Sequence, residues 1–383
     1  MKNSRVLKVA AVAAVAFSVI FAPFASATTW KAGGASSVNG LMAACKAAYQ
    51  AATGDDFPYN GTGSGAGKTG IQNGTMDFAF SDSVVTTELI ANEIHLPAFI
   101  WPVAILTNLG GSNKPLTLST ETLAKIFAGQ ITKWNDPAIV AENNRASTVI
   151  IYKKDQNGAV AKDKKGAPIV LRTSVVQNHR TLPDKAITVF YRSANSGTSN
   201  NLTRAFNKLY PSIWTKAPAD SFATAFPGTI SSDPVHFRGA VGSGDVANGV
   251  KATPYSITYA EVGFAAAPYN LAITSVINAA GNAIVPSSDS AMAAAAQATV
   301  KDDGTVTFDY ATKDPAAYPF TATTYALALT DYKDATKAAG IKKTLNYLAT
   351  NCAKDNPSLG FGAYTPTNAF AIAFQRQLAK LGK

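Results

Sequence analysis

Apolar residues along the chain fall into two kinds of pattern, short unbroken runs and longer stretches with helical spacing. Unbroken runs at residues 99–106, 186–191 and 323–329 are typical of strands that are buried on both faces of a sheet. Residues 38–52 and 122–130 instead place apolar side chains three or four positions apart, which predicts helices. Alternation of the two patterns along the chain predicts an α/β fold.

Polar clusters rich in serine, threonine and glycine stand where predicted strands give way to predicted helices. Four of them are residues 35–37, 63–65, 81–83 and the turn from Arg192 to Thr198. Backbone N–H groups at the start of a helix can bind an anion, and the partial positive charge of the helix N-terminus favours this. The clusters together offer hydroxyls, N–H groups, one guanidinium and one carboxylate, and so predict an anion site.

The first residues predict export from the cell interior. Residues 2–8 carry three positive charges, residues 9–24 are almost wholly apolar, and residues 25–27 (Ala-Ser-Ala) form a small-x-small cleavage site. This is the pattern of a secretory signal peptide spanning residues 1–27, with the mature protein starting at Thr28. The alternative is an uncleaved membrane anchor, but the apolar run is shorter than the ~20 residues that a spanning helix needs.

Length and charge narrow the class of protein. A mature chain of 356 of the 383 residues exceeds a single small core, so two lobes are expected. Its formal net charge is +7 once the three charges of the signal peptide are subtracted from +10. The basic stretch 153–165 is interleaved with Asp155, Asp163 and glycine and lacks the aromatic residues of a nucleic-acid stacking platform. We expect a solvated loop or hairpin there, and no nucleic-acid partner.

The positions of the cysteines and histidines indicate whether a disulfide or a metal site is expected. Cys45 and Cys352 would enter an oxidising compartment, where a disulfide can form, although their spacing does not show that they meet. His95, His179 and His236 are isolated, and no Cys/His pair has the spacing of metal ligands. Neither paired carboxylates nor a Ser/His/Asp order suggests catalysis. We expect no metal, no cofactor and no enzymatic activity.

Residues 62–69, Thr-Gly-Ser-Gly-Ala-Gly-Lys-Thr, resemble a nucleotide-binding phosphate loop by letter. The first position of the pattern G-x4-G-K-[ST] is Thr62 rather than glycine. The G-x-G-x-x-G pattern at residues 65–70 has no acidic residue at the expected distance in a βαβ unit. An exported protein also has little access to ATP or NAD. The turn still supplies unhindered N–H groups and the Ser64 hydroxyl at the start of a helix.

Five motifs occur in a fixed order along the mature chain. They are Gly-Ala-Ser at 34–36, the glycine-rich turn 61–67, Asp-Phe-Ala-Phe-Ser-Asp at 77–82, the stretch 125–139, and the turn 192–198. In this order they resemble the PstS-type periplasmic phosphate-binding protein of the high-affinity phosphate ABC transporter. The resemblance is strong over the N-terminal half of the mature chain and looser around residues 321–325. Ordered agreement at five places is more specific than any single motif.

The resemblance implies a two-lobed type II periplasmic binding protein fold with a ligand cleft between the lobes. Residues 28–102 and 324–383 would form lobe one, and residues 103–323 would form lobe two. Both cysteines would then fall in lobe one, which makes a disulfide between Cys45 and Cys352 testable.

The resemblance also implies a ligand set. The expected phosphate-binding residues are Ser36, Ser37, Ser64, Asp82, Arg192, Ser196, Gly197 and Thr198. Hydroxyls and N–H groups would donate to phosphate oxygens, and Arg192 would make a charge-assisted contact. Asp82 would accept the proton that phosphate keeps near neutral pH. Sulfate has no such proton, so a carboxylate at this position would exclude it.

The chain departs from the family pattern at Ala194, where relatives have an aspartate that pairs with the arginine. Its absence should leave Arg192 freer and the pocket more positive, unless another acid replaces it. Asp245, in the glycine-rich turn 242–245, is the candidate. Discrimination of phosphate from sulfate is therefore expected to depend mainly on Asp82.

The function implied is capture of inorganic phosphate by hinge closure and its delivery to ABC-transporter permease subunits in the inner membrane. The protein would be monomeric and periplasmic, or secreted. One alternative keeps the fold but uses phosphate binding for adhesion, sensing or secretion. The other is a secreted phosphoester hydrolase, which would need a metal set or an activated nucleophile that the three isolated histidines do not suggest.

Overall fold

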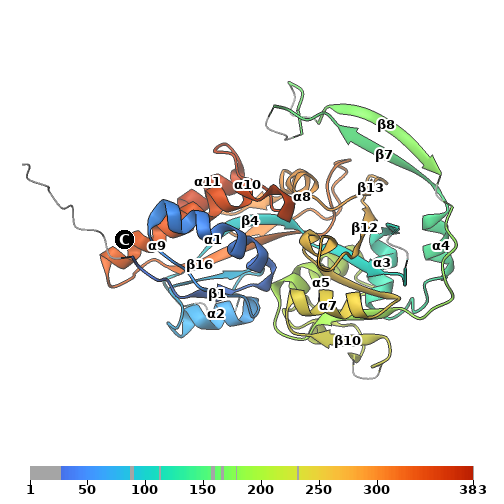
Figure 1. Cartoon of the computed structure of the whole chain (residues 1–383), viewed down its shortest axis with the longest axis horizontal. Helices are drawn as coiled ribbons and strands as arrows, with labels where there is room; N and C mark the ends of the chain where they lie inside the picture. Colours follow the sequence, from blue (N-terminus) through green and yellow to red (C-terminus); the bar gives the residue numbers. More distant parts are fainter. Residues whose placement is uncertain are drawn as a thin grey trace, which may run out of the picture.

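The computed structural model describes residues 27–86, 90–111, 114–156, 160–164, 168–177, 179–230 and 233–382. The expected signal peptide lies outside these residues except for Ala27. Figure 1 shows two mixed α/β lobes side by side, each built around its own sheet. The two-lobed α/β fold expected from the sequence is confirmed.

Five strands form the sheet of lobe one. Their order is β2 (Tyr59–Asn60), β1 (Ala32–Gly34), β3 (Phe78–Ser81), β16 (Thr321–Leu329) and β4 (Glu93–Pro102). β1 runs parallel to β2 and β3, whereas β16 is antiparallel to β3 and β4. Every residue of β3 is buried, because helices cover both faces of this sheet.

The covering helices flank the sheet in Figure 1. α2 (Ser64–Gln72) lies on one face, and α1 (Asn39–Thr53), α9 (Ala335–Tyr347) and α11 (Ala369–Leu378) lie on the other. The buried residues of α1 are Leu41, Met42, Cys45 and Tyr49. They repeat at the three- and four-residue spacing from which the sequence predicted this helix.

Lobe two has a larger sheet. Its order is β10 (Phe237–Ala240), β9 (Thr188–Arg192), β11 (Ser256–Ala260), β5 (Ala104–Asn108), β12 (Ala272–Ile277) and β13 (Ala283–Ile284), with β6 (Thr117–Ser119) beside β12. Its helices are α3 (Thr120–Phe127), α4 (Pro137–Asn143), α5 (Gly197–Leu209), α6 (Phe222–Ala225) and α7 (Ser243–Ala252). Aromatic rings fill its core: Phe206 lies 5.1 Å from Trp214, and Phe222 lies 5.8 Å from Tyr259, between ring centroids.

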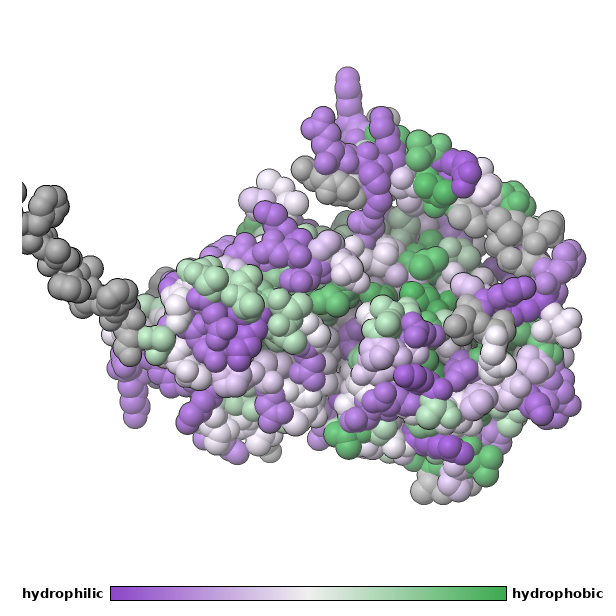
Figure 2. All heavy atoms as spheres, in the orientation of Figure 1, coloured by the Kyte–Doolittle hydropathy of each residue, from purple (hydrophilic) through white to green (hydrophobic). Residues whose placement is uncertain are grey.

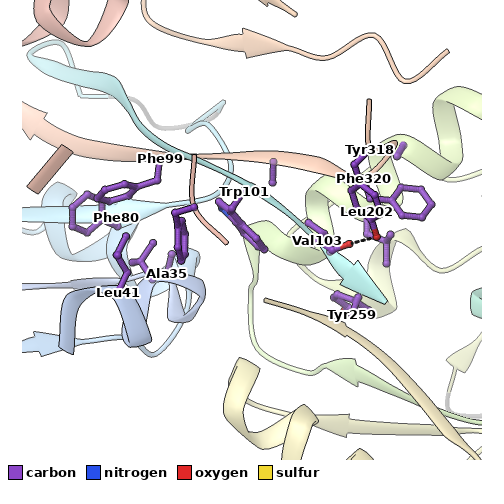
Figure 3. Packing of buried hydrophobic residues seen from close by; sticks show 14 of the residues in the cluster. Ala35, Leu41, Phe80, Phe99, Trp101, Val103, Leu202, Tyr259, Tyr318 and Phe320 are labelled. Carbon is purple, nitrogen blue, oxygen red and sulfur yellow. Dashed lines mark hydrogen bonds between the residues drawn. The ribbon is translucent and has the colours of Figure 1, made fainter. Parts of the chain in front are cut away.

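Two of the chain's passages between the lobes lie side by side. Only Val103 separates the end of β4 at Pro102 from the start of β5. The returning segment begins β16 at Thr321, which pairs with Pro102. The Val103 N–H donates to the Phe320 carbonyl at 2.7 Å, and the Tyr318 hydroxyl donates to the Val103 carbonyl at 3.0 Å. Figure 3 shows buried side chains continuing from one lobe to the other past this crossover.

One segment from the middle of the chain packs on the sheet of lobe one. α8 (Ser288–Ala295) lies within residues 103–323, the stretch expected in lobe two, yet its buried alanines contact Ile100 and Phe370. Lobe one therefore contains this segment as well as the two ends of the described chain. The remaining short elements are η1 (Ser36–Val38), η3 (Val262–Ala265), β14 (Thr299–Val300), β15 (Val306–Thr307), η4 (Leu348–Cys352), α10 (Ala353–Asp355) and η5 (Pro357–Leu359).

A hairpin projects from lobe two (Figure 1). It consists of β7 (Ala146–Tyr152) and β8 (Val170–Gln177), which pair antiparallel. The described residues of the basic stretch continue from the end of this hairpin, and bridges join Lys154 to Val160 and Lys162 to Pro168. Leu171 is an exposed apolar residue of β8, and Figure 2 shows apolar and polar side chains next to each other on this arm.

The two cysteines are joined in lobe one. Cys45 of α1 and Cys352 at the end of η4 form a disulfide with a Cα–Cα distance of 5.3 Å. Nearby, the Tyr49 and Thr344 hydroxyls lie 2.7 Å apart. The bridge spans 307 residues of sequence and ties the first helix of the lobe to the segment that follows α9.

Replacing Cys45 and Cys352 together by alanine should lower the free energy of unfolding by about 2–5 kcal/mol, because the bridge closes a very long loop in the unfolded chain. Denaturant titration of both proteins without reductant measures the difference. The same titration with reductant is the control, since it should bring the wild type to the stability of the variant. Equal midpoints without reductant would contradict a stabilising role.

Candidate functional site

Polar side chains from both lobes meet beside the crossover. In lobe one, η1 and α2 begin shortly after β1 and β2, and Asp82 directly follows β3. In lobe two, α5 begins after β9 and α7 after β10. The strand, turn and helix order therefore brings several helix N-termini to one place. We call the group the polar junction; it consists of Ser36, Ser37, Ser64, Asp82, Arg192, Ser196, Gly197, Thr198, Ser243, Glu261 and Thr324.

Asp82 is the carboxylate at the centre of the polar junction, and only 2% of it is exposed. One carboxylate oxygen accepts hydrogen bonds from Ser37 Oγ at 2.8 Å and Thr324 Oγ1 at 2.6 Å. The other accepts from Thr198 Oγ1 at 3.0 Å, and the Asp82 N–H donates to Ser64 Oγ at 3.1 Å. Burial raises the pKa of Asp82, while the three hydroxyls and the nearby guanidinium act in the opposite direction.

Arg192 is the buried cation of the polar junction, at the end of β9. Its Nε donates to the Val241 carbonyl at 2.6 Å, and its Nη1 donates to Ser243 Oγ at 3.2 Å. Its Nη2 is buried and has no hydrogen-bond partner among the described residues. Leaving a buried charged donor without a hydrogen bond costs free energy, so a hydrogen bond from this nitrogen to an anion would be stabilising.

Two glycines allow the lobes to approach. Gly63 has a φ of 135°, which other residues rarely adopt, and a Cβ there would lie 2.8 Å from the Asn195 carbonyl oxygen. The Gly65 N–H donates to that same oxygen at 3.2 Å. A Cβ on Gly197 would lie 2.7 Å from the carbonyl carbon of Asp82. A side chain at either glycine would hold the two lobes apart.

All eight residues predicted from the sequence lie in the polar junction and are buried. The hydroxyl groups among them have different hydrogen-bond partners. Ser196 Oγ caps α5 by accepting from the Ser199 N–H at 3.4 Å, whereas Ser36 Oγ lies 3.1 Å from Ser243 Oγ across the lobes. The first hydroxyl is therefore engaged in helix capping, and the second joins the lobes.

The sequence interpretation missed Ser243, Glu261 and Thr324. Ser243 begins a helix after a glycine-rich turn, the signal by which the other donors were found. Glu261 directly follows the buried strand β11, and an acid at the end of an apolar run is a weaker signal. Thr324 lies inside a late apolar run, and its role depends on β16 pairing with β3.

Asp245 does not replace the acid missing at position 194. It is exposed, and its Oδ2 accepts from the Gly242 N–H at 2.8 Å, which caps α7. The acid near Arg192 is Glu261, whose Oε1 accepts from Ser243 Oγ at 3.0 Å. Burial and the charge of Asp82 raise the pKa of Glu261 to about 8, although Arg192 lowers it.

A second polar contact joins the lobes at the edge of the polar junction. Lys68 of α2 donates to Asp220 Oδ2 at 2.8 Å and to Ser83 Oγ at 2.9 Å. Ser83 Oγ in turn donates to Asp220 Oδ1 at 2.7 Å. The side chains of the ion pair are each only 16% exposed. A groove of about 620 Å³, lined by residues of both lobes, opens beside this pair.

His95 and His236 each contact groups outside the polar junction. His95 is buried, and its Nε2 accepts from the Val85 N–H at 2.9 Å; burial lowers its pKa to about 4. His236 lies against Asp233 at 2.8 Å. Within the described parts of the chain, no group of three or more His, Cys, Asp or Glu residues is arranged to hold a metal ion. No described helix combines the length and apolar character needed to pass through a membrane.

Comparison of the sequence with known families and proteins gives consistent matches. A family model described as the PBP superfamily domain matches residues 22–351. The phosphate-binding protein PstS of Pasteurella multocida is 33% identical over 291 residues, which cover 74% of this chain and 72% of that protein. Phosphate-binding protein PstS 3 of Mycobacterium tuberculosis is 29% identical over 331 residues, covering 83% of this chain and 76% of its own length.

Solved structures share the fold. A high-affinity periplasmic phosphate-binding protein bound with phosphate has a TM-score of 0.62 at 22% identity, covering 93% of this chain and 99% of that one. A phosphate-binding protein from Stenotrophomonas maltophilia has a TM-score of 0.59 at 20% identity, covering 92% and 94%. The two-lobed architecture is thus common to this chain and these proteins.

Replacing Lys68 by methionine should weaken closure of the lobes, because it removes a largely buried ion pair and leaves Asp220 without its cation. We expect the free energy of unfolding to fall by about 1–2 kcal/mol. Denaturant titration followed by tryptophan fluorescence measures it. Lys133→Met is the control, since the pair between Lys133 and Asp184 is 60% and 65% exposed and should contribute little. Equal effects of the two substitutions would contradict this role.

Proposed function

The chain belongs to the PBP superfamily and, within it, to the family of PstS phosphate-binding proteins, and on that premise we propose that it captures inorganic phosphate between its two lobes for ABC-type import. Members of this family are substrate-binding proteins rather than enzymes. The observation that carries the proposal is the burial of Asp82 and Arg192 in one polar junction, surrounded by hydroxyls at helix N-termini.

The chemistry of the polar junction suits a partly protonated oxyanion. The unpaired Nη2 of Arg192 is a charged donor for a phosphate oxygen. The hydroxyls of Ser37, Thr198 and Thr324, which donate to Asp82, can rotate to donate to a bound anion instead. Once these hydroxyls donate to the anion, Asp82 remains an acceptor, and only an anion that carries a proton can donate to it. Phosphate meets this condition near neutral pH, and sulfate does not.

We assign the ligand set on these grounds. The proposed phosphate-binding residues are Ser36, Ser37, Ser64, Asp82, Arg192, Ser196, Gly197 and Thr198, and Thr324 joins them by its contact with Asp82. Gly197 would contribute through its backbone N–H at the N-terminus of α5, whereas Ser196 would donate its hydroxyl hydrogen, since its own N–H already donates to the Asp220 carbonyl at 2.9 Å. Hinge motion at the two adjacent crossovers would open and close the site.

The cellular setting follows from the N-terminal segment and the family. We propose cleavage near Ala27, a monomeric mature protein in the periplasm or outside the cell, and delivery of phosphate to permease subunits in the inner membrane. The formal charge of +7 on the mature chain favours attraction of anions in general, so selectivity must come from the site itself.

Calorimetry with phosphate, arsenate and sulfate on phosphate-stripped protein tests the proposal. We expect phosphate to bind and sulfate to bind about 10⁴-fold or more weakly, the ratio typical of sites that require a ligand proton. Asp82→Asn should still bind phosphate and should lose most of its discrimination against sulfate, because the repelling charge is gone.

Asp136→Asn is the matched control, since Asp136 caps α4 outside the polar junction and asparagine caps helices equally well. It should leave both affinities unchanged. Failure of the wild type to bind phosphate would overturn the proposed function. Sulfate exclusion that persists in Asp82→Asn would overturn only the role of Asp82.

A further inference from the structure

Glu261 is a buried acid for which phosphate capture as proposed above needs no role. It follows β11 at the start of η3 and is 7% exposed. Its Oε1 accepts from Ser243 Oγ at 3.0 Å, and the same Ser243 Oγ accepts from Arg192 Nη1 at 3.2 Å. One hydroxyl therefore links the acid to the only cation of the polar junction.

The surroundings of Glu261 contain few other charges. η3 packs against β5, β12 and η5, whose residues carry no titratable side chains, and β11 also packs against β9 and α7. Besides Tyr259 on β11 itself and Asp82 at the end of β3, the titratable groups on these elements are Tyr191, Arg192, Asp245 and Lys251. Asp245 accepts a hydrogen bond from the Gly242 N–H at the start of α7, and Lys251 donates to the Pro268 carbonyl at 2.7 Å. Asp82 and Arg192 are thus the charges that act on Glu261.

We propose that Glu261 sets the charge of the phosphate site, acting on Arg192 through Ser243, and that phosphate binds more tightly when Glu261 holds its proton. The inference rests on the proposed function. With its proton, Glu261 is neutral, and Arg192 keeps its full charge for the anion. Without its proton, Glu261 and Asp82 place two negative charges beside one buried cation, and the site repels phosphate.

The direction of the pH dependence follows from linkage. A bound anion stabilises the protonated form of Glu261, so its pKa is higher in the complex than in the free protein. Affinity is therefore unaffected by this group below its free pKa of about 8 and falls as pH rises above it, by at most about tenfold per pH unit. Phosphate itself stays a dianion over that range. The neighbouring Tyr259, whose pKa is raised to about 12, also stays unchanged there.

The first experiment titrates phosphate into the full mature protein at intervals from pH 7 to about pH 9.5. The wild type should lose affinity above pH 8, whereas the affinity of Glu261→Gln, which has no carboxyl proton to lose, should change less than about twofold per pH unit over the same range. Glu142→Gln is the matched control. Glu142 accepts from Thr122 Oγ1 at 2.8 Å, away from the polar junction, and this variant should follow the wild-type profile.

The second experiment uses the wild type alone and does not depend on the folding of a variant. Calorimetry near pH 9 in buffers of different ionisation enthalpy counts the protons taken up with phosphate, and we expect a value approaching about one. Parallel pH profiles of wild type and Glu261→Gln, no proton uptake, or loss of phosphate binding by Glu261→Gln at pH 7 would each overturn the inference. Absence of phosphate binding by the wild type at pH 7 would instead overturn the proposed function.

Discussion

The architecture depends on burying a carboxylate and a guanidinium together without a direct pair between them. Asp82 is satisfied by three hydroxyls, and Arg192 by a backbone carbonyl and Ser243. Isolated buried charges are very costly, and polar partners reduce that cost without neutralising the charge. The carboxylate oxygens of Asp82 and one N–H donor of Arg192 can therefore bind a ligand. A direct salt bridge between the two residues would have occupied these groups.

This arrangement constrains the backbone around it. The partners of the two charges come from both lobes, so the turns that carry them must lie almost in contact. Gly63 and Gly197 make this possible, because a side chain at either position would meet the opposite lobe. Hydroxyls at helix N-termini then provide donors with little volume, and N-terminal backbone dipoles add positive potential where an anion would sit.

The contacts between the lobes differ in kind from those within them. Within lobe one, the contacts are buried aromatic rings and the disulfide between Cys45 and Cys352. Between the lobes, one apolar cluster continues past the two adjacent chain passages, and polar bonds such as the pair between Lys68 and Asp220 lie beside it. Polar contacts exchange with water at small net cost, whereas apolar cores do not. We propose that the polar contacts break when the lobes move apart, and that an anion bonded to both lobes favours the closed arrangement.

The sequence alone determined the α/β class, and it predicted an export signal and eight polar residues that lie together in the structure, because local patterns and ordered motifs record these features. It did not determine that Glu261, rather than Asp245, lies near Arg192. Asp245 caps the start of α7, whereas Glu261 lies near the arginine because β11 pairs with β9. Thr324 and the pair of Lys68 with Asp220 depend likewise on long-range strand pairing and lobe packing. Consecutive residues are enough to predict the polar turns at helix starts. The groups that lie beside a buried charge and shift its pKa come from segments distant in sequence, so only the tertiary structure identifies them.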